Sequence, residues 1–180
     1  PQAVVDEPTL QRNIAAMRAR VPGRVALHPH IKTHKSRAIA ALQRAAGATG
    51  FTVARLNEAA MLLDAKLGPV TLAQPFVDHR GPAHLVRTYG ADLRCIADSA
   101  QTVAAVAAAA GDRPVDVFLK IDVGLHRCGV DPNGDAALAV ARSIANNSRL
   151  RFAGLFSHAG HAYGAGNPDG VRKVATEELA

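Results

Sequence analysis

Apolar residues recur along the chain in two alternating patterns, one typical of short strands and one typical of amphipathic helices. The strand pattern is a short apolar run bounded by glycine, proline or charged residues. It predicts strands at residues 3–5, 25–30, 51–54, 70–73, 93–97, 115–121 and 151–156. We interpret these segments as strands.

Between the strands, apolar residues return at the three- and four-residue spacing of a helix face. Asp6 followed by Pro8 is typical of a helix start, and Pro22-Gly23 would end that helix. The predicted helical stripes run through residues 10–17, 39–46, 56–63, 85–89, 99–110 and 137–144, and the last residues of the chain also fit a helix.

Six strand–helix units in series with short connections imply parallel strands joined by right-handed crossovers. The two architectures that fit are a doubly wound α/β sheet and a (β/α)8 TIM-type barrel. No G-x-G-x-x-G sequence joins a strand to a helix, which disfavours the dinucleotide-binding fold. A barrel of about 250 residues needs two more units. The 180 residues stop inside a helical pattern, so we expect an incomplete barrel whose remainder lies beyond residue 180.

Composition places the chain among folded proteins, because 48% of its residues are hydrophobic and 20% are charged. No apolar run reaches the length of a membrane span, and no signal peptide is visible. Cys95 and Cys128 are too few for a disulfide framework. We therefore expect a cytoplasmic protein that does not bind membranes.

The formal net charge of +6 raises the question of nucleic acid as a partner. However, aromatic residues make up only 4% of the chain, tryptophan is absent and the arginines are scattered. A nucleic-acid surface needs a basic stripe, so we expect none here. A small anionic ligand such as a phosphate ester suits this charge better.

Residues 28–36 (HPHIKTHKS) concentrate three histidines and two lysines directly after an apolar run. Lys32 follows the predicted strand by two residues, with His34 and Lys35 close by in sequence. Neighbouring cations favour the neutral, nucleophilic form of a lysine amine, which Schiff-base chemistry requires. The stretch therefore predicts a lysine as the chemical centre.

Other polar residues follow the later strands, and in a barrel this end of the strands carries the active site. They are Arg55, Gln74, Asp98, Asp122 with Arg127, and His158 with His161. The opposite connections are mostly glycine, proline and alanine, so the asymmetry predicts an enzyme. Simpler readings exist for three of them: Asp98 as a helix cap, Gln74 as a partner of loop backbone and Arg55 as a surface charge.

A zinc-dependent barrel hydrolase is the chemical rival. His28 and His30 would share one face of a strand, and His126 and His158 follow later strands. Yet Lys32 would then share that face and place a cation beside the metal. No carboxylate is near His28 or His30 in sequence, so we disfavour this interpretation.

Five motifs together resemble the family of D-threonine aldolase and D-serine dehydratase, fold type III pyridoxal-phosphate enzymes related to alanine racemase. They are residues 29–36 (PHIKTHKS), 52–55 (TVAR) with Glu58, 97–99 (ADS), 122–130 (DVGLHRCGV) and 154–163 (GLFSHAGHAY). The resemblance implies that residues 1–180 are the N-terminal part of a pyridoxal-phosphate-binding, alanine racemase-like barrel domain. A C-terminal β domain is expected beyond the chain.

The resemblance also implies roles for individual residues. Lys32 would bind pyridoxal 5'-phosphate covalently, and Arg127 would hydrogen-bond the phenolic oxygen of the cofactor. His158 and Tyr163 would lie near the cofactor or substrate. The residues expected around this site are His30, His34, Lys35, Arg55, Gln74, Asp122 and His161. Lys35 would add positive field rather than covalent chemistry.

The reaction implied is that of a pyridoxal-phosphate-dependent lyase acting on D-β-hydroxy amino acids. We predict the D-threonine aldolase type, which gives glycine and an aldehyde, with D-serine dehydratase as the main alternative. An amino-acid racemase, the zinc hydrolase and a non-catalytic pyridoxal-phosphate carrier stay open. A divalent metal (Mn, Mg or Zn) is expected, with its ligands beyond residue 180. A homodimer is expected, in which the partner's β domain completes the active site.

Overall fold

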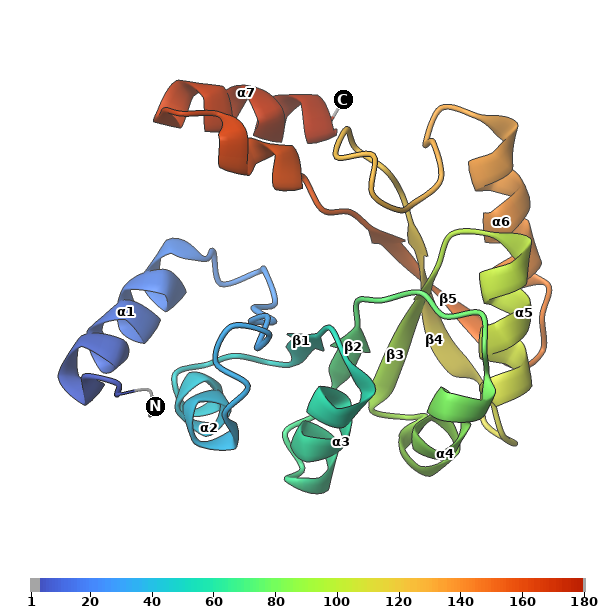
Figure 1. The fold of residues 1–180 in the computed structure, drawn as a ribbon, viewed down its shortest axis with the longest axis horizontal. Coiled ribbons are helices and arrows are strands. Elements are labelled where there is room, and N and C mark those ends of the chain that lie inside the picture. Colours follow the sequence, from blue (N-terminus) through green and yellow to red (C-terminus); the bar gives the residue numbers. More distant parts are fainter. Residues whose placement is uncertain (1–3, 180) are drawn as a thin grey trace. The chain divides into compact units, whose positions relative to one another are not determined.

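The computed structural model describes residues 4–179, which form two compact units. The boundary between the units in the chain lies between Ala73 and Gln74. In each unit, α-helices alternate along the chain with parallel strands (Figure 1). The parallel arrangement predicted from the spacing of the apolar runs is therefore confirmed.

The first unit is built around a short parallel strand pair. Its elements are α1 (Glu7–Arg20), α2 (Arg37–Ala45), β1 (Phe51–Val53), α3 (Leu56–Asp64) and β2 (Val70–Leu72). β1 pairs with β2 so that Phe51 lies opposite Val70. Both residues are fully buried, together with Ile31 and Leu62, and they form the core of this unit.

Side-chain caps define where the first two helices begin, as the sequence predicts for α1. The Asp6 carboxylate accepts a hydrogen bond from the Thr9 N–H at 2.9 Å, one turn into α1. Ser36 Oγ accepts one from the Ile39 N–H at 3.3 Å at the start of α2. The α2 cap matters for the site, because it fixes the chain directly after the histidine- and lysine-rich stretch.

Two predicted strands do not form. Val4 and Val5 are exposed and irregular, while Ala3 lies outside the described residues. Of residues 25–30, only His30 forms a bridge, parallel to Thr52. This segment still lies along β1, because the Thr52 N–H donates to Pro29 O at 2.9 Å. Pro29 has no N–H to donate, which explains why an extended segment does not become a strand.

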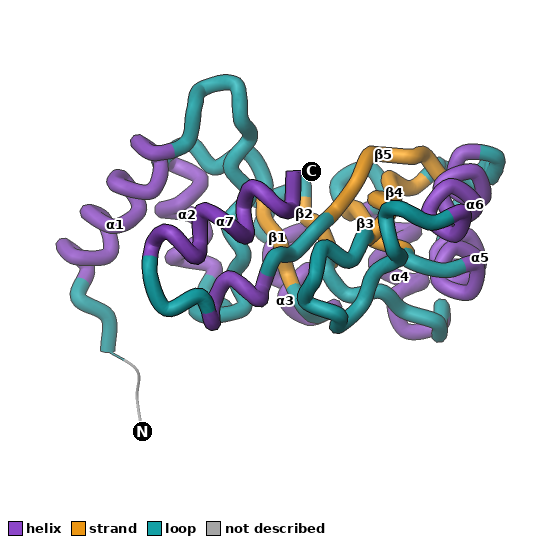
Figure 2. The backbone as a smooth tube through the Cα atoms, turned by 90° about the horizontal axis from the view of Figure 1, so that it is seen from above, coloured by secondary structure: helices purple, strands orange, loops and turns teal. Residues whose placement is uncertain are grey.

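The second unit contains a three-stranded parallel sheet. Its elements are α4 (Arg80–Tyr89), β3 (Leu93–Ala97), α5 (Ala100–Ala109), β4 (Val115–Lys120), α6 (Asp135–Ala145), β5 (Leu150–Phe156), the 3-10 helix η1 (Gly160–Gly164) and α7 (Pro168–Leu179). β3 pairs with β4 and β4 with β5, with a bulge between Val117 and Phe118. α5 and α6 lie against each other along one side of this sheet (Figure 1, Figure 2).

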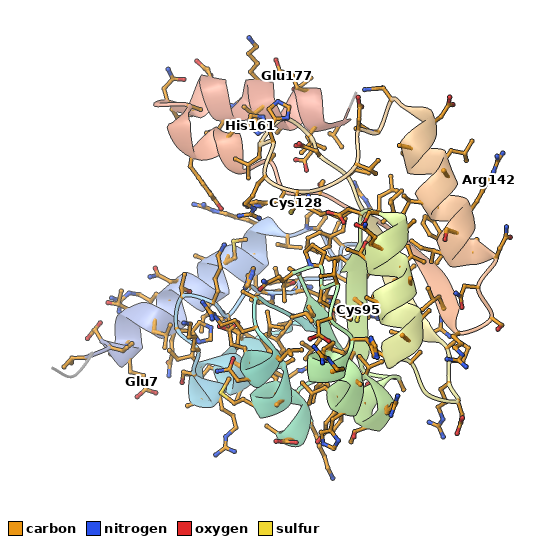
Figure 3. The ribbon with its side chains drawn as sticks, turned by 45° about the vertical axis from the view of Figure 1, so that its right-hand side comes forward. Glu7, Cys95, Cys128, Arg142, His161 and Glu177 are labelled. Atoms are coloured by element: carbon orange, nitrogen blue, oxygen red, sulfur yellow. The ribbon has the colours of Figure 1, made fainter. Side chains whose placement is uncertain are left out.

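Cys95 in β3 lies in the core of the second unit (Figure 3). It is fully buried together with Ile96, Val106 and Val117. Burial raises the pKa of the Cys95 thiol to about 12, because the thiolate would lose its hydration. Within residues 4–179, no helix is long and apolar enough to cross a membrane.

Candidate functional site

Polar residues follow the carboxyl end of each strand, as the sequence predicts. Arg55 comes two residues after β1, Gln74 two after β2, Asp98 directly after β3, Asp122 two after β4 and His158 two after β5. In parallel α/β folds this end of the strands carries the chemistry.

Lys32 lies in a tight turn that is fixed by backbone hydrogen bonds. The turn starts at Ile31, which is fully buried and whose N–H donates to Thr52 O at 3.0 Å. Ile31 O accepts from the His34 N–H at 3.1 Å and from the Lys35 N–H at 2.8 Å. The Lys32 side chain itself is exposed. The sequence thus holds a primary amine on a rigid turn that is open to solvent.

His30 contributes to this turn through its ring. Its Nδ1 accepts a hydrogen bond from the Lys32 N–H at 3.2 Å. His28 is packed elsewhere, because a Cβ on Gly50 would lie 2.7 Å from His28 Cε1. Among residues 4–179, no three His, Cys, Asp or Glu side chains lie together as metal ligands would. The paired-histidine arrangement of the zinc hypothesis therefore has no third described ligand.

His34 is half-buried behind the turn. Its Nδ1 accepts a hydrogen bond from the Ser36 N–H at 3.0 Å, which fixes the ring beside the start of α2. Burial lowers the pKa of His34, and the hydrogen bonds to Gln43 and Ser36 oppose this only in part. This ring is therefore a neutral, positioned group near the Lys32 turn.

Lys35 closes the turn in an unusual backbone conformation. Its φ of +48° lies in the left-handed region that favours glycine. Its Nζ lies 4.0 Å from Glu58 Oε1, and Glu58 is buried in α3. The carboxylate also accepts from the Ala54 N–H at 2.9 Å, at the end of β1. Glu58 thus connects the end of β1 with the lysine turn.

In the second unit, Arg127 lies on a closed loop after β4. An isolated parallel bridge between Ile121 and Val130 joins the two ends of the loop. Inside it, Asp122 Oδ1 accepts from the Gly124 and His126 N–H groups, both at 3.0 Å. These bonds lower the pKa of Asp122, the His126 N–H being the largest cause. The loop is therefore ordered by contacts among its own residues: the bridge at its ends and the hydrogen bonds that the Asp122 carboxylate accepts.

Asp98 fixes the same loop from the end of β3. Its carboxylate accepts from the Gly129 N–H at 3.2 Å and from the Thr102 hydroxyl at 3.3 Å. The residue that caps α5 is Ser99, whose Oγ accepts from the Thr102 N–H at 3.3 Å. The simple reading of Asp98 as the helix cap is therefore wrong, because its carboxylate reaches the next loop instead.

Lys120 is a site residue that the sequence reasoning missed. It ends β4, is buried, and its Nζ donates to Ile121 O at 2.7 Å. Burial lowers its pKa, the nearby Cys128 and Asp122 oppose that shift, and Arg127 adds to it. The signal available in the sequence was a lysine directly after the apolar residues Val117, Phe118 and Leu119 of a predicted strand.

Of the two histidines after β5, His158 precedes η1 and His161 lies within it. The rings of His158 and Tyr163 lie 5.9 Å apart, and Tyr163 is 82% exposed. A Cβ on Gly124 would lie 3.3 Å from His161 Cε1, so the imidazole packs directly on the Arg127 loop. Figure 3 shows His161 on the segment beside α7 and Cys128 on that loop.

The structure therefore assembles two clusters of predicted residues. His30, Lys32, His34 and Lys35 share the turn of the first unit. Asp122 and Arg127 share the loop of the second, on which the His161 ring of η1 packs, and the His158 and Tyr163 rings lie close to each other. The side chains of Arg55 and Gln74 form no hydrogen bond or ion pair with other residues of the described chain, and both are exposed.

Comparison with known proteins gives the same family over nearly the whole chain. The family model "Alanine racemase, N-terminal domain" matches residues 5–179. D-threo-3-hydroxyaspartate dehydratase from Delftia sp. (strain HT23) is 36% identical over 184 residues, covering 100% of this chain and 48% of that protein. D-threonine aldolase from Arthrobacter sp is 32% identical over 168 residues, covering 89% of this chain and 43% of that protein.

Solved structures agree with the sequence comparisons. The Delftia sp. HT23 dehydratase matches with a TM-score of 0.89 at 38% identity, covering 99% of this chain and 48% of that one. D-threonine aldolase from Filomicrobium marinum matches with a TM-score of 0.88 at 30% identity, covering 97% and 48%. The chain spans about half the length of these relatives. It belongs to the alanine racemase N-terminal domain family, and its alternating helices and parallel strands are part of that family's TIM-type barrel.

Proposed function

We propose that the protein to which this chain belongs is a pyridoxal-phosphate-dependent lyase that acts on D-3-hydroxy amino acids. The observation that carries the proposal is the exposed Lys32 amine on its fixed turn, within a chain that matches D-amino-acid lyases over its whole length. The relatives are named as a dehydratase of D-threo-3-hydroxyaspartate, an aldolase of D-threonine and a dehydratase of D-serine.

The residues present fit the cofactor by their chemistry. Covalent binding of an aldehyde needs a primary amine that is not held in an ion pair. Lys32 forms no ion pair with another described residue, and its backbone is fixed by the His30 ring. An anionic oxygen of the cofactor needs a permanent cation, and Arg127 supplies a guanidinium on an ordered loop.

When bound, pyridoxal phosphate supplies an electron sink for the cleavage of bonds at the substrate Cα. In our proposal, Lys32 would hold the cofactor through Nζ, and the same amine would be the base that takes the proton from the substrate Cα. Arg127 would donate hydrogen bonds to the phenolic oxygen and favour its anionic form. Tyr163 and His158 would lie near the cofactor or substrate.

We favour loss of water as the reaction, instead of the retro-aldol cleavage that the motifs alone led us to predict. The supporting observation is the 36% identity with D-threo-3-hydroxyaspartate dehydratase over the whole chain. Removal of the Cα proton and the 3-hydroxyl gives an enamine, which water hydrolyses to a 2-oxo acid and ammonia. D-threonine aldolase chemistry is the second candidate, because the alignment with the Arthrobacter sp D-threonine aldolase includes 89% of this chain at 32% identity.

We also propose that a divalent metal assists departure of the hydroxyl group. A variant of D-threo-3-hydroxyaspartate dehydratase has been solved in a metal-free form, which is the support for a metal in this family. The ligands would come from residues outside the present chain. The homodimer expected from the resemblance is likewise a proposal for the full-length protein.

The test is to purify the full-length protein with pyridoxal phosphate, reduce it with borohydride and map the labelled peptide by mass spectrometry. We expect the label on Lys32 and its loss in Lys32→Arg, while Lys35→Arg keeps it. The same protein is then given D-threonine, D-serine and D-threo-3-hydroxyaspartate, with and without chelator. Ammonia with a 2-oxo acid supports dehydration, and glycine with an aldehyde supports the aldolase. Absence of label on Lys32 contradicts the proposal.

A further inference from the structure

Two features of the first unit have no role in the chemistry proposed so far. Lys35 adopts a φ of +48°, which costs a residue with a Cβ of the order of 1 kcal/mol or more. Glu58 keeps a carboxylate 97% out of solvent, since only 3% of the residue is exposed. Each feature is unfavourable alone, and the two side chains face each other.

Glu58 is only half satisfied by the backbone. Its Oε2 accepts from the Ala54 N–H at 2.9 Å, whereas Oε1 has no hydrogen-bond partner among the described residues. A buried carboxylate oxygen needs a counter-charge, and the nearest is Lys35 Nζ at 4.0 Å. Lys35 keeps 57% of its side chain exposed, so its stem reaches from solvent to the buried group.

Lys35 is also bound to the start of the Lys32 turn. Its N–H donates to Ile31 O at 2.8 Å, and the Ile31 N–H donates to Thr52 O next to the end of β1. The ion pair to Glu58 and this pair of backbone bonds therefore hold both ends of the turn against β1 and α3. Lys32 lies between the two attachments.

We propose that Lys35 and Glu58 are positioning residues for Lys32: their ion pair holds the turn so that the Lys32 amine is presented in one orientation. This inference rests on the proposed function of Lys32, but it concerns the geometry of the turn rather than the reaction. The inference gives Lys35 a partner within the protein, Glu58. This role is additional to the positive field that the sequence led us to expect from Lys35.

Lys66 provides a matched control. It has a φ of +57°, is exposed and follows the end of α3, with its N–H donating to Leu63 O at 2.9 Å. It forms no ion pair with another described residue. Replacing Lys66 removes a lysine at positive φ from the same unit without touching the Lys32 turn.

The experiment measures how fast the full-length protein, stripped of cofactor, is labelled at Lys32 by pyridoxal phosphate and borohydride. We expect labelling about five-fold slower in Lys35→Met and in Glu58→Gln, because a misoriented amine reacts less often. The double variant should be no slower than the slower single one. Lys35→Arg and Lys66→Met should stay within about two-fold of wild type, because the first keeps the ion pair and the second never had one.

Amide hydrogen exchange of residues 32–36 in the cofactor-free protein is the second readout. It should rise in Lys35→Met and not in Lys66→Met. Unchanged labelling and exchange in Lys35→Met would overturn the inference, as would equal losses in Lys66→Met. If Lys35→Met does not fold, Glu58→Gln and Lys35→Arg give the same comparison. If wild type is not labelled at Lys32, the proposed function fails, whereas the exchange data still test the positioning.

Discussion

His34 shows at the residue scale how burial sets the charge of a side chain near the candidate site. Desolvation lowers its pKa below the ordinary 6.5, and the hydrogen bonds to Gln43 and Ser36 only partly restore it. The His34 imidazole therefore binds a proton less readily in the folded protein than in the unfolded chain. Folding is linked to pH through this difference.

The sign of that linkage gives a prediction. The stability contributed by neutral His34 is complete above pH 6.5 and is lost as the pH falls through the lowered value. Urea unfolding at pH 7.5 and at successively lower pH should show a loss of stability that is smaller in His34→Gln, since glutamine does not titrate. Parallel curves for the two proteins would contradict the prediction.

Gly129 has the most demanding glycine position on the Arg127 loop. Its φ is +118°, and a Cβ there would lie 2.6 Å from the Ile121 carbonyl carbon. We expect Gly129→Ala to lower the free energy of unfolding by about 2–4 kcal/mol. Gly164→Ala is the control, with no atom within 4 Å of its Cβ and an expected change within about 0.5 kcal/mol. Urea denaturation measures both.

At the element scale, the Arg127 loop is ordered from two strands at once. The Ile121–Val130 bridge closes it at the end of β4, and Asp98 holds it from the end of β3. Because the loop is held at its base, the Arg127 side chain is presented by an ordered backbone rather than by a free loop.

Asp98→Ala tests this arrangement. The Gly129 N–H and the Thr102 hydroxyl lose an acceptor, and we expect a loss of about 1–3 kcal/mol in the free energy of unfolding. The affinity of the full-length protein for pyridoxal phosphate should also fall, measured by absorbance titration. Asp112→Ala, at an exposed position before β4, should change neither. Unaltered cofactor affinity in Asp98→Ala would show that the Arg127 loop needs no such support.

The elements were predictable where local chemistry defines them. The cap at Asp6 marks the start of a helix by itself, and the apolar runs mark β1–β5. The irregular segment before Lys32 was wrongly predicted as a strand, because its apolar residues are typical of one. Pro29 lacks the backbone N–H that strand pairing would need there. The order of polar residues at the strand ends followed directly from the strand predictions.

The contacts within the site were less predictable than its residues. Lys32 and Arg127 were selected from their motifs, but the Lys35–Glu58 ion pair and the Asp98–Gly129 hydrogen bond join residues 23 and 31 positions apart. Such pairings depend on how the elements pack against each other, and the spacing of residues along the sequence does not determine that packing. Lys120 was missed because the prediction placed it inside the strand 115–121 without asking which of that strand's polar side chains would be buried.

At the scale of the whole molecule, the chain spans about half the length of its relatives. The homodimer expected from the resemblance is therefore a prediction for the full-length protein. Sedimentation equilibrium at micromolar concentration should give twice the mass of one chain, and the mass should not change when pyridoxal phosphate is added. A single-chain mass at every concentration tested would contradict it.

The burial of Cys95 has a practical consequence for spectroscopy. A thiol that is shielded from solvent, with its pKa raised to about 12, reacts slowly with thiol reagents. Cys128 is only half-buried and directly follows Arg127. Of these two cysteines, we expect a maleimide dye to modify Cys128 first under native conditions, as peptide mapping would show. Cys128 would then be an attachment point for a fluorescent reporter. Because it is next to Arg127 in the sequence, such a reporter would respond to changes around the Arg127 guanidinium.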